Sequence, residues 1–397
     1  MRKSLLVKSA VVAAWSWTLG CGPATAPEEI EDASTAAVES TGATTTPANS
    51  NPAADGTTTD VADGTASGPG EMGTTSSAES TGAGEPTATT GEPPPLGPVD
   101  CRDEPPEGAQ VAPPLPVYDG MCPPLLPGLN SIESSGFGRD FLLVVPTEFD
   151  PSEPLPVIFL WHWLGGSANS FLEEGDVQNA VDQFGFIAVI PESSDELIFR
   201  WPFTIIDSEA RVEQEFRFFD DMLACVDEQF PVEPNCVSSA GVSAGGLFTT
   251  QLAAGRGQHL ASFMSLSGGS GGAFVRPWSE SAHTMPAMVL WGGEQDFCVA
   301  IDFNNVSLEL EADLAADGHF ILECIHNCMH TAPPFEVERG ATTFAPMWEF
   351  AFSHPYWLEP GQSPYLETGV PPQMPEWCGI GMGGSMPREG ECGPNQC

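Results

Sequence analysis

Ser243 lies in the stretch Ala-Gly-Val-Ser-Ala-Gly-Gly, where small residues flank a single serine on both sides. A Gly-x-Ser-x-Gly pattern carries a nucleophilic serine when it forms a tight turn between a strand and a helix. The neighbours of such a serine must be small, as Gly241, Ala244 and Gly245 are. The amide of Ala244 would then face the negative charge that develops on a substrate oxygen. Glycine and serine are common in this chain, so the surrounding elements must decide whether Ser243 is a nucleophile or a loop residue.

A nucleophilic serine needs a general base, and histidine is the most frequent one. With this kind of turn the residues follow the chain order serine, acid, histidine. Five of the seven histidines are excluded, because they precede the acid, start the last strand or follow the last helix: His162, His259, His283, His319 and His354. The loop that leaves the last predicted strand contains the two that remain, His326 and His330.

The acid should follow a strand that comes after the serine turn. Asp296 lies just beyond the end of an apolar run, and Glu294 and Asp302 are the alternatives. A carboxylate at this place would orient the imidazole and stabilise its charged form. A solvated loop acid is the other interpretation of Asp296.

Apolar runs and helix-like spacing predict the elements that would position these residues. The predicted strands cover 139–146, 155–163, 184–193, 235–242, 260–269, 285–293 and 319–325. The predicted helices cover 171–184, 218–230, 247–255, 306–318 and 341–353, the last one interrupted by Pro346. Strands that alternate with helices indicate an α/β fold, a mostly parallel doubly wound sheet with helices on both faces. Ser243 then lies between a strand and a helix, which favours the nucleophile.

The N-terminal hundred residues differ from the rest of the chain. Residues 1–20 have the basic start and apolar run of a signal peptide, and Cys21 resembles the lipidated cysteine of bacterial lipoproteins. An ordinary signal peptide cut nearby is the alternative. Residues 21–100 are rich in Ala, Thr, Gly and Pro and predict a disordered acidic tether, which cannot bury a core. We expect an exported protein, either an outer-membrane or cell-surface lipoprotein or otherwise secreted, with a membrane contact only through a lipid at Cys21.

Charge limits the partners of the chain. The formal net charge is −43, and a field of that sign repels nucleic acid and anionic lipid. We therefore expect no nucleic-acid partner and no anionic polymer as substrate. The sequence leaves the oligomeric state open.

Ten cysteines follow Cys21, an even number that indicates disulfides in an exported chain. We expect Cys298 to pair with Cys324 or Cys328, and Cys225 to pair with Cys236. Cys324 and Cys328 lack a second Cys/His pair at zinc-finger spacing, so no metal site is predicted. Residues 354–397 are rich in Cys, Pro and Gly and are expected to cover the catalytic domain 101–353 rather than to form a second domain.

Several stretches resemble the α/β-hydrolase superfamily and, within it, the secreted polyhydroxybutyrate depolymerases and the feruloyl and acetylxylan esterases. The matching stretches are 155–171, 185–193, 220–246 and 285–299, and with the histidine loop they cover roughly residues 139–353. The resemblance implies an α/β-hydrolase fold. It selects His330, because Met-His-Thr-Ala-Pro-Pro is similar to the His-Thr segment of the family, and it supports Asp296 through Gly293.

The resemblance also implies a second amide for the oxyanion, besides that of Ala244. By position the donor is Leu164, with Trp163 as the alternative. Trp163 replaces the glycine of the family's His-Gly pair, and the aromatic-rich stretch 199–204 departs from the family pattern. Trp161, Trp163, Trp201, Phe199 and Phe203 are candidates for an aromatic acyl or sugar site, or for core packing.

The predicted function is an exported serine carboxylic-ester hydrolase with the triad Ser243, His330 and Asp296. It forms an acyl-enzyme and needs no cofactor. Neutral polyesters, esterified polysaccharides and lipid esters are all open as substrates. The alternatives are a non-catalytic binding module on the same fold, which a missing triad member would indicate, and a serine peptidase, which an extra propeller or long cap would indicate.

Overall fold

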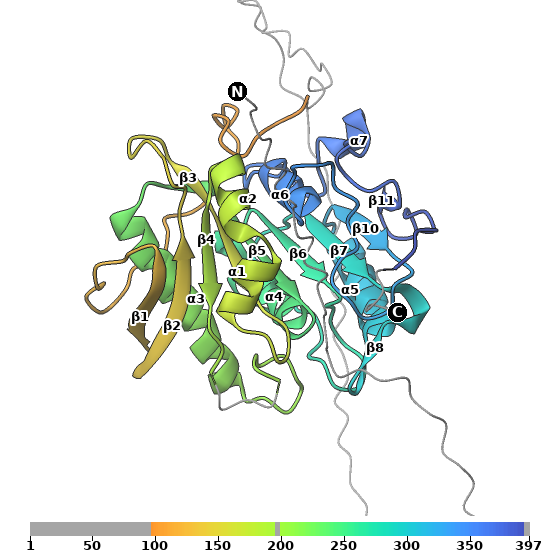
Figure 1. The fold of residues 1–397 in the computed structure, drawn as a ribbon, viewed down its shortest axis with the longest axis horizontal. Coiled ribbons are helices and arrows are strands. Elements are labelled where there is room, and N and C mark those ends of the chain that lie inside the picture. The colour runs from red at the N-terminus through yellow and green to blue at the C-terminus, as the bar shows by residue number, and fades with distance from the viewer. Residues whose placement is uncertain (1–96, 195–198, 393–397) are drawn as a thin grey trace, which may run out of the picture. The chain divides into compact units, whose positions relative to one another are not determined.

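The computed structural model describes residues 97–194 and 199–392, and these residues form one sheet of nine strands with helices around it (Figure 1). The predicted signal peptide, Cys21 and the predicted tether up to residue 96 lie outside the described residues. In sheet order the strands are β1 (Gly128–Ser134), β2 (Phe137–Val144), β4 (Ile187–Pro191), β3 (Leu155–Trp161), β5 (Val232–Val242), β6 (Ser262–Leu266), β7 (Ala287–Trp291), β10 (Ile321–Ile325) and β11 (Cys378–Ile380).

The sheet is mostly parallel, as the sequence predicts. From β4 to β10 each strand pairs in parallel with its neighbour. The antiparallel strands β1 and β2 lie at one edge of the sheet, and β11 pairs antiparallel with β10 at the opposite edge. A short ribbon of β8 (Phe297–Cys298) and β9 (Ile301–Asp302) lies apart from this sheet. The carboxyl ends of the parallel strands meet at one edge, where the loops bring residues from distant parts of the chain together.

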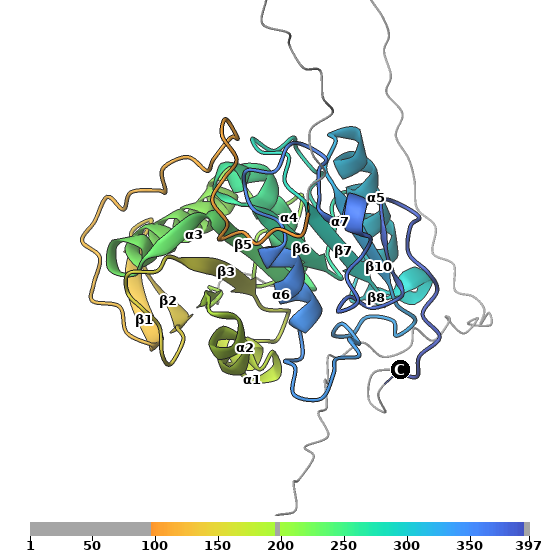
Figure 2. The ribbon, with the colours of Figure 1, turned by 90° about the horizontal axis from the view of Figure 1, so that it is seen from above.

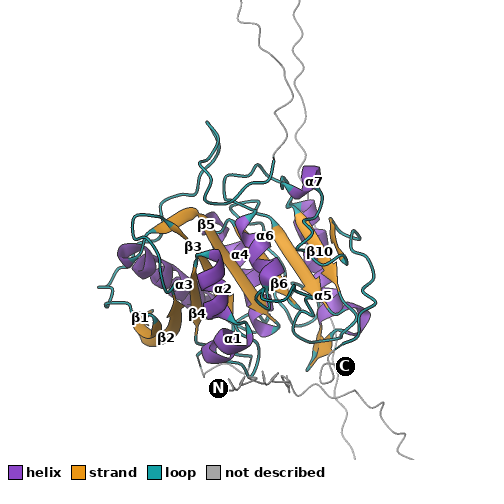
Figure 3. Cartoon of the chain, turned by 45° about the horizontal axis from the view of Figure 1, so that its top comes forward, coloured by secondary structure: helices purple, strands orange, loops and turns teal. Residues whose placement is uncertain are grey.

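Helices cover both faces of the sheet, which the view in Figure 2 and the colours of Figure 3 make clear. One face packs against α3 (Glu209–Gln229), α4 (Ala244–Arg256) and α5 (Phe303–Ala316). The other packs against α1 (Ala168–Glu174), α2 (Val177–Phe184) and α6 (Ala345–Phe352). The short helix α7 (Tyr365–Thr368) precedes β11. Among the described residues, no helix has the length and apolar character that crossing a membrane requires.

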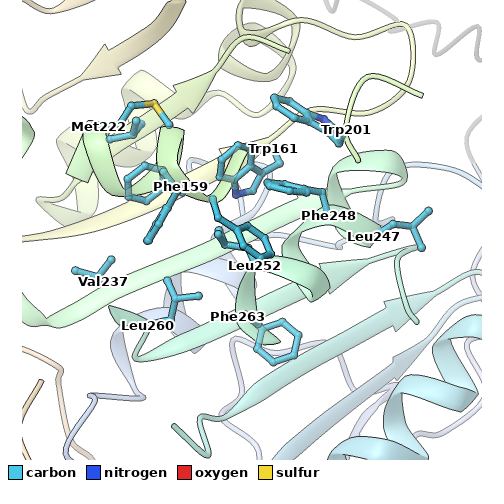
Figure 4. Close-up of a cluster of buried hydrophobic side chains, with 14 of the residues drawn as sticks. Phe159, Trp161, Trp201, Met222, Val237, Leu247, Phe248, Leu252, Leu260 and Phe263 are labelled. Carbon is cyan, nitrogen blue, oxygen red and sulfur yellow. The ribbon is translucent and has the colours of Figure 1, made fainter. Parts of the chain in front are cut away.

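Two hydrophobic cores lie on the two faces of the sheet, because successive side chains of a strand point to opposite sides. In β3, Val157, Phe159 and Trp161 belong to one core, and Ile158 and Leu160 belong to the other. A strand buried on both faces needs apolar residues at every position, which explains the continuous apolar run of β3. Figure 4 shows Phe159 and Trp161 packed with side chains of α4 in the first core.

Several predicted bounds were wrong for local reasons. The single helix expected at 171–184 is two helices, because Gly175 ends α1 and Asp176 follows with a left-handed φ of 50°. Pro346 lies at the start of α6 and does not interrupt it, since the first turn of a helix tolerates proline. β1 was not predicted, because two of its three buried residues, Asn130 and Ser134, are polar and Leu129 is exposed, so the strand lacks an apolar pattern.

The expected disulfide pairings were wrong. The four bonds whose two cysteines are both described are Cys101–Cys236, Cys122–Cys225, Cys324–Cys378 and Cys328–Cys392. Cys298 is also disulfide-bonded, but its partner is neither Cys324 nor Cys328. Cys225 and Cys236 lie in cores on opposite faces of the sheet, as do Cys298 and Cys324, so the sheet separates these two expected pairs.

Candidate active site

Ser243 lies in the tight turn between β5 and α4. Its backbone has φ 56° and ψ −119°, in a region that a residue with a side chain rarely adopts. The Ser243 amide donates to the carbonyl oxygen of Leu266 at the end of β6, at 2.9 Å, and the Ser243 carbonyl accepts the first helical hydrogen bond, from Leu247. Bonds to both neighbouring elements hold the serine in this conformation.

The glycines around Ser243 are required by close backbone contacts. A Cβ atom on Gly241 would lie 2.1 Å from the carbonyl oxygen of Gly245, and one on Gly245 would lie 2.0 Å from the carbonyl oxygen of Trp161. Neither backbone atom can move away as the end of a flexible side chain can. The pattern of small residues therefore reflects the packing of the turn against β3 and α4.

His330 reaches Ser243 from the loop that follows β10. Its Nε2 accepts a hydrogen bond from the Ser243 hydroxyl at 2.9 Å, and its ring stacks on Phe303 with the ring centroids 4.2 Å apart. The Nδ1 atom faces a carboxylate, so it carries the hydrogen and leaves Nε2 free to accept. This tautomer is the one that a general base for the serine requires.

Asp296 is fully buried behind His330. Its Oδ1 accepts the His330 Nδ1 hydrogen at 2.6 Å, and its Oδ2 accepts from the Ser267 hydroxyl at 2.8 Å and from the Gly292 amide at 2.7 Å. Three donors thus satisfy the buried carboxylate. The sequence interpretation missed Ser267 and Gly292, although each directly follows a strand, β6 or β7, at the edge where the site forms.

The alternatives to these residues lie elsewhere. Glu294 is exposed, and the exposed Asp302 accepts from the Asn305 amide as the N-cap of α5. His326 is buried against Trp377, and its Nδ1 accepts from the Cys328 amide at 3.1 Å. Burial lowers the pKa of His326 to about 4, so its ring is neutral at pH 7. The structure brings His330, and not His326, to Ser243.

The two candidate oxyanion donors, Ala244 and Leu164, lie in two segments that are close to Ser243. Ala244 is the first residue of α4, where backbone amides have no partner within the helix. Leu164 is half-buried in the loop after β3. The start of this loop packs against the beginning of α4, since a Cβ on Gly245 would lie 2.8 Å from the carbonyl oxygen of His162. The two segments are thus adjacent.

Glu192 supports the same loop and was not singled out from the sequence. It follows β4, accepts from the Ala168 amide at 2.9 Å, and lies 3.4 Å from Nε2 of the fully buried His162. Burial raises the pKa of Glu192, but the nearby His162 ring and the bond from the Ala168 amide outweigh it and lower the pKa overall. Glu192 therefore stays ionised and connects β4 to the loop after β3.

Most of the aromatic side chains considered for a ligand site are core residues. Trp161, Trp201 and Phe203 are at most 1% exposed, and Trp161 and Trp201 pack edge to face in the core of Figure 4. The Trp201 indole also donates to the carbonyl oxygen of His162 at 2.8 Å. Trp163 is 6% exposed and packs near Phe171 in the other core.

In the part of the chain that the structure describes, no group of three His, Cys, Asp or Glu side chains is arranged to hold a metal ion.

Comparison with known proteins supports the resemblance seen in the sequence. No family model matches the chain. Feruloyl esterase C of Emericella nidulans is 28% identical over 151 residues, which are 38% of this chain and 52% of that protein. Feruloyl esterase D of Neurospora crassa is 26% identical over 136 residues, which are 34% of this chain and 47% of that protein. The chain thus spans about half the length of these curated relatives.

Solved structures match a larger share of the chain. The structure of a protein called sOPH has a TM-score of 0.55 at 18% identity and covers 67% of this chain and 97% of its own. That of pOPH has a TM-score of 0.54 at 19% identity, with coverages of 66% and 97%. At this level of identity the likeness establishes the fold.

Proposed function

We propose that this chain, which has the α/β-hydrolase fold, is a serine hydrolase of carboxylic esters with Ser243 as its nucleophile. The observation that carries the proposal is the continuous line of hydrogen bonds from Asp296 through His330 to the Ser243 hydroxyl, with distances of 2.6 and 2.9 Å. The partial matches to feruloyl esterases support the same class of reaction.

The proposed first step is attack of Ser243 on the ester carbonyl. His330 takes the hydroxyl proton at Nε2 as the new C–O bond forms, and Asp296 stabilises the resulting imidazolium through Nδ1. The carbonyl oxygen becomes negative, and the amides of Ala244 and Leu164 are the proposed donors to it. His330 then protonates the leaving alcohol oxygen, and the acyl group stays on Ser243.

The second step repeats this sequence with water. His330 takes a proton from a water molecule that attacks the acyl carbonyl, and returns the proton to Ser243 as the acid product leaves. Every proton transfer in these two steps uses Nε2 of His330, so the proposed reaction needs no metal or organic cofactor. The buried Asp296 is held in place by three donors, from His330, Ser267 and Gly292.

The proposed substrate is a neutral ester, such as a feruloylated or acetylated polysaccharide or a polyester. The partial matches to feruloyl esterases favour a feruloylated substrate. The net charge of −43 disfavours anionic polymers as substrates. We also propose that the protein is exported, since its disulfides are typical of oxidising compartments. Lipidation at Cys21 stays a prediction, which mass spectrometry of the mature N-terminus would test.

Replacing Ser243 tests the function. Ser243→Ala should fold normally and lose turnover on a panel of nitrophenyl, feruloyl and acetyl esters, and a fluorophosphonate probe should label the wild type but not this variant. Ser152→Ala is the matched control, because Ser152 is an exposed serine whose hydroxyl donates to Asp150, its partner within the described residues. Labelling of Ser243→Ala at the rate of the wild type would contradict the assignment.

A further inference from the structure

We infer that the C-terminal residues Arg388–Cys392, here called the clasp, position His330 for catalysis. The inference rests on the function proposed above and assigns a role to a segment outside the catalytic domain. Arg388 and Cys392 are positioning residues in it, since they act through the loop that carries His330. The clasp itself belongs to the region after β11, the last strand of the sheet.

His330 lies in a loop whose position is not fixed by hydrogen bonds of a helix or strand. No helix or strand is formed between the end of β10 at Ile325 and the start of α6 at Ala345. Met329, just before His330, has a φ of 57°, which a residue with a side chain rarely adopts. A Cβ on Gly292 would lie 1.9 Å from the Met329 carbonyl oxygen, so the loop is pressed against the end of β7. A strained backbone persists only where its surroundings hold it.

Arg388 bonds to the loop on both sides of His330. Its guanidinium donates to the Asn327 side-chain oxygen at 2.6 Å and to a Glu336 carboxylate oxygen at 3.1 Å. The side chain of Arg388 is only 5% exposed. Because the guanidinium is planar and its donors have fixed directions, it sets the distance between the two halves of the loop.

A covalent bond anchors the loop at a second point. Cys328, two residues before His330, forms a disulfide with Cys392 of the clasp. The Asn327 side chain also donates to the carbonyl oxygen of Gly390 at 2.9 Å. The buried Arg388 and the disulfide thus attach Asn327 and Cys328 to the clasp, immediately before the strained Met329.

The geometry at the serine makes this anchoring important for turnover. His330 must keep 2.9 Å to Ser243 and 2.6 Å to Asp296 at the same time. A displacement of about 1 Å in a catalytic group lowers the rate by roughly 10². Loosening the clasp should therefore reduce kcat, which depends on the base, and leave KM nearly unchanged.

The test compares Arg388→Met and Arg388→Lys with Arg256→Met as the matched control. Arg256 is a partly buried arginine that pairs with Glu213 and Asp220 at the end of α4. We expect Arg388→Met to lower kcat at least about tenfold with KM within about twofold, and Arg388→Lys to restore part of kcat. Arg256→Met should keep kcat within about twofold at a similar loss of thermal stability. Equal kcat values for the wild type and Arg388→Met would overturn the inference.

A second readout needs no activity. The proton between His330 Nδ1 and Asp296 in a 2.6 Å hydrogen bond should give a far-downfield proton NMR signal. We expect this signal to broaden or shift in Arg388→Met and to persist in Arg256→Met. If the wild type hydrolyses no ester, the proposed function fails, and this signal still tests the clasp. An unchanged signal in Arg388→Met would contradict the inference.

A milder variant covers the case in which Arg388→Met does not fold. Asn327 is exposed, so Asn327→Ala should fold while losing its bonds to Arg388 and Gly390. We expect kcat to fall about threefold or more, again with KM nearly constant, and wild-type kcat in this variant would count against the clasp.

Discussion

Two histidines four residues apart have opposite environments in this protein. His330 faces a hydroxyl on one side and a carboxylate on the other, whereas His326 is buried, and Nε2 of His326 has no hydrogen-bond partner among the described residues. Burial holds the pKa of His326 near 4, too low for a base that must exchange protons near neutral pH. The difference arises from the loop, which turns His330 towards the serine after β10 has ended.

Alanine variants separate the two histidines. His330→Ala should lower kcat by a factor of about 10³ or more, as loss of a triad base does. His326→Ala should change mainly stability, with about a tenfold effect on activity at most. Steady-state kinetics together with thermal unfolding of both variants measure this. Near-normal turnover in His330→Ala together with an inactive His326→Ala would show that His326, and not His330, is the general base.

Sequence patterns pointed to individual site residues such as Ser243 and Asp296, but not to the residues that form hydrogen bonds with them. Ser243 could be proposed as the nucleophile because a nucleophile turn needs small neighbours at fixed sequence positions. Ser267 and Gly292 donate to Asp296 from the ends of β6 and β7. That contact depends on the order of strands in the sheet, which no local sequence pattern contains. Leu164 and Ala244 stay predictions, since their role appears only with an oxyanion present.

At the level of elements, α5 and β10 enclose a pair of buried carboxyl groups. Glu311 of α5 is fully buried and Glu323 of β10 is 1% exposed. Burial, and then the charge of Glu323, raise the pKa of Glu311 to about 9. Glu323 is also buried, but the amides of Ser385 and Gly383 donate to it at 2.9 and 2.7 Å, and its pKa is lowered. Glu311 is thus neutral at pH 7, while the ionised Glu323 binds the backbone after β11.

Glu311 makes stability depend on pH. Below its ordinary pKa of 4.5 the group is protonated in the folded and unfolded states alike. Between that value and about 9 unfolding releases a proton, so the free energy of unfolding falls as pH rises. Glu311→Gln imitates the neutral acid and should flatten this fall. Thermal unfolding at several pH values between 5 and 9 measures it, and parallel curves for the variant and the wild type would refute the prediction.

For the whole molecule, the alternation of strands and helices was sufficient to predict the fold class. Buried parallel strands such as β3 are apolar at every position and are easily recognised. The half-exposed β1 lacks that signal. The disulfides were predicted wrongly because sequence proximity does not reveal on which face of the sheet a cysteine lies, as Cys225 and Cys236 show.

Reduction should destabilise the folded domain strongly. Two of the disulfides close loops with sequence separations of 135 and 103 residues, and each bond of this kind contributes about 2–4 kcal/mol. The melting temperature measured with and without a reductant should therefore differ by many degrees. Equal melting temperatures in a sample whose thiol titration confirms complete reduction would contradict this expectation.

The bonds Cys101–Cys236 and Cys122–Cys225 are nested, with the second loop lying wholly within the first. A protease that cuts once anywhere between residues 122 and 225 therefore leaves two fragments that stay joined by two covalent links. Ser243, Asp296 and His330 all remain on the downstream fragment. Backbone cleavage across this hundred-residue stretch thus does not release the half of the fold that contains these three residues.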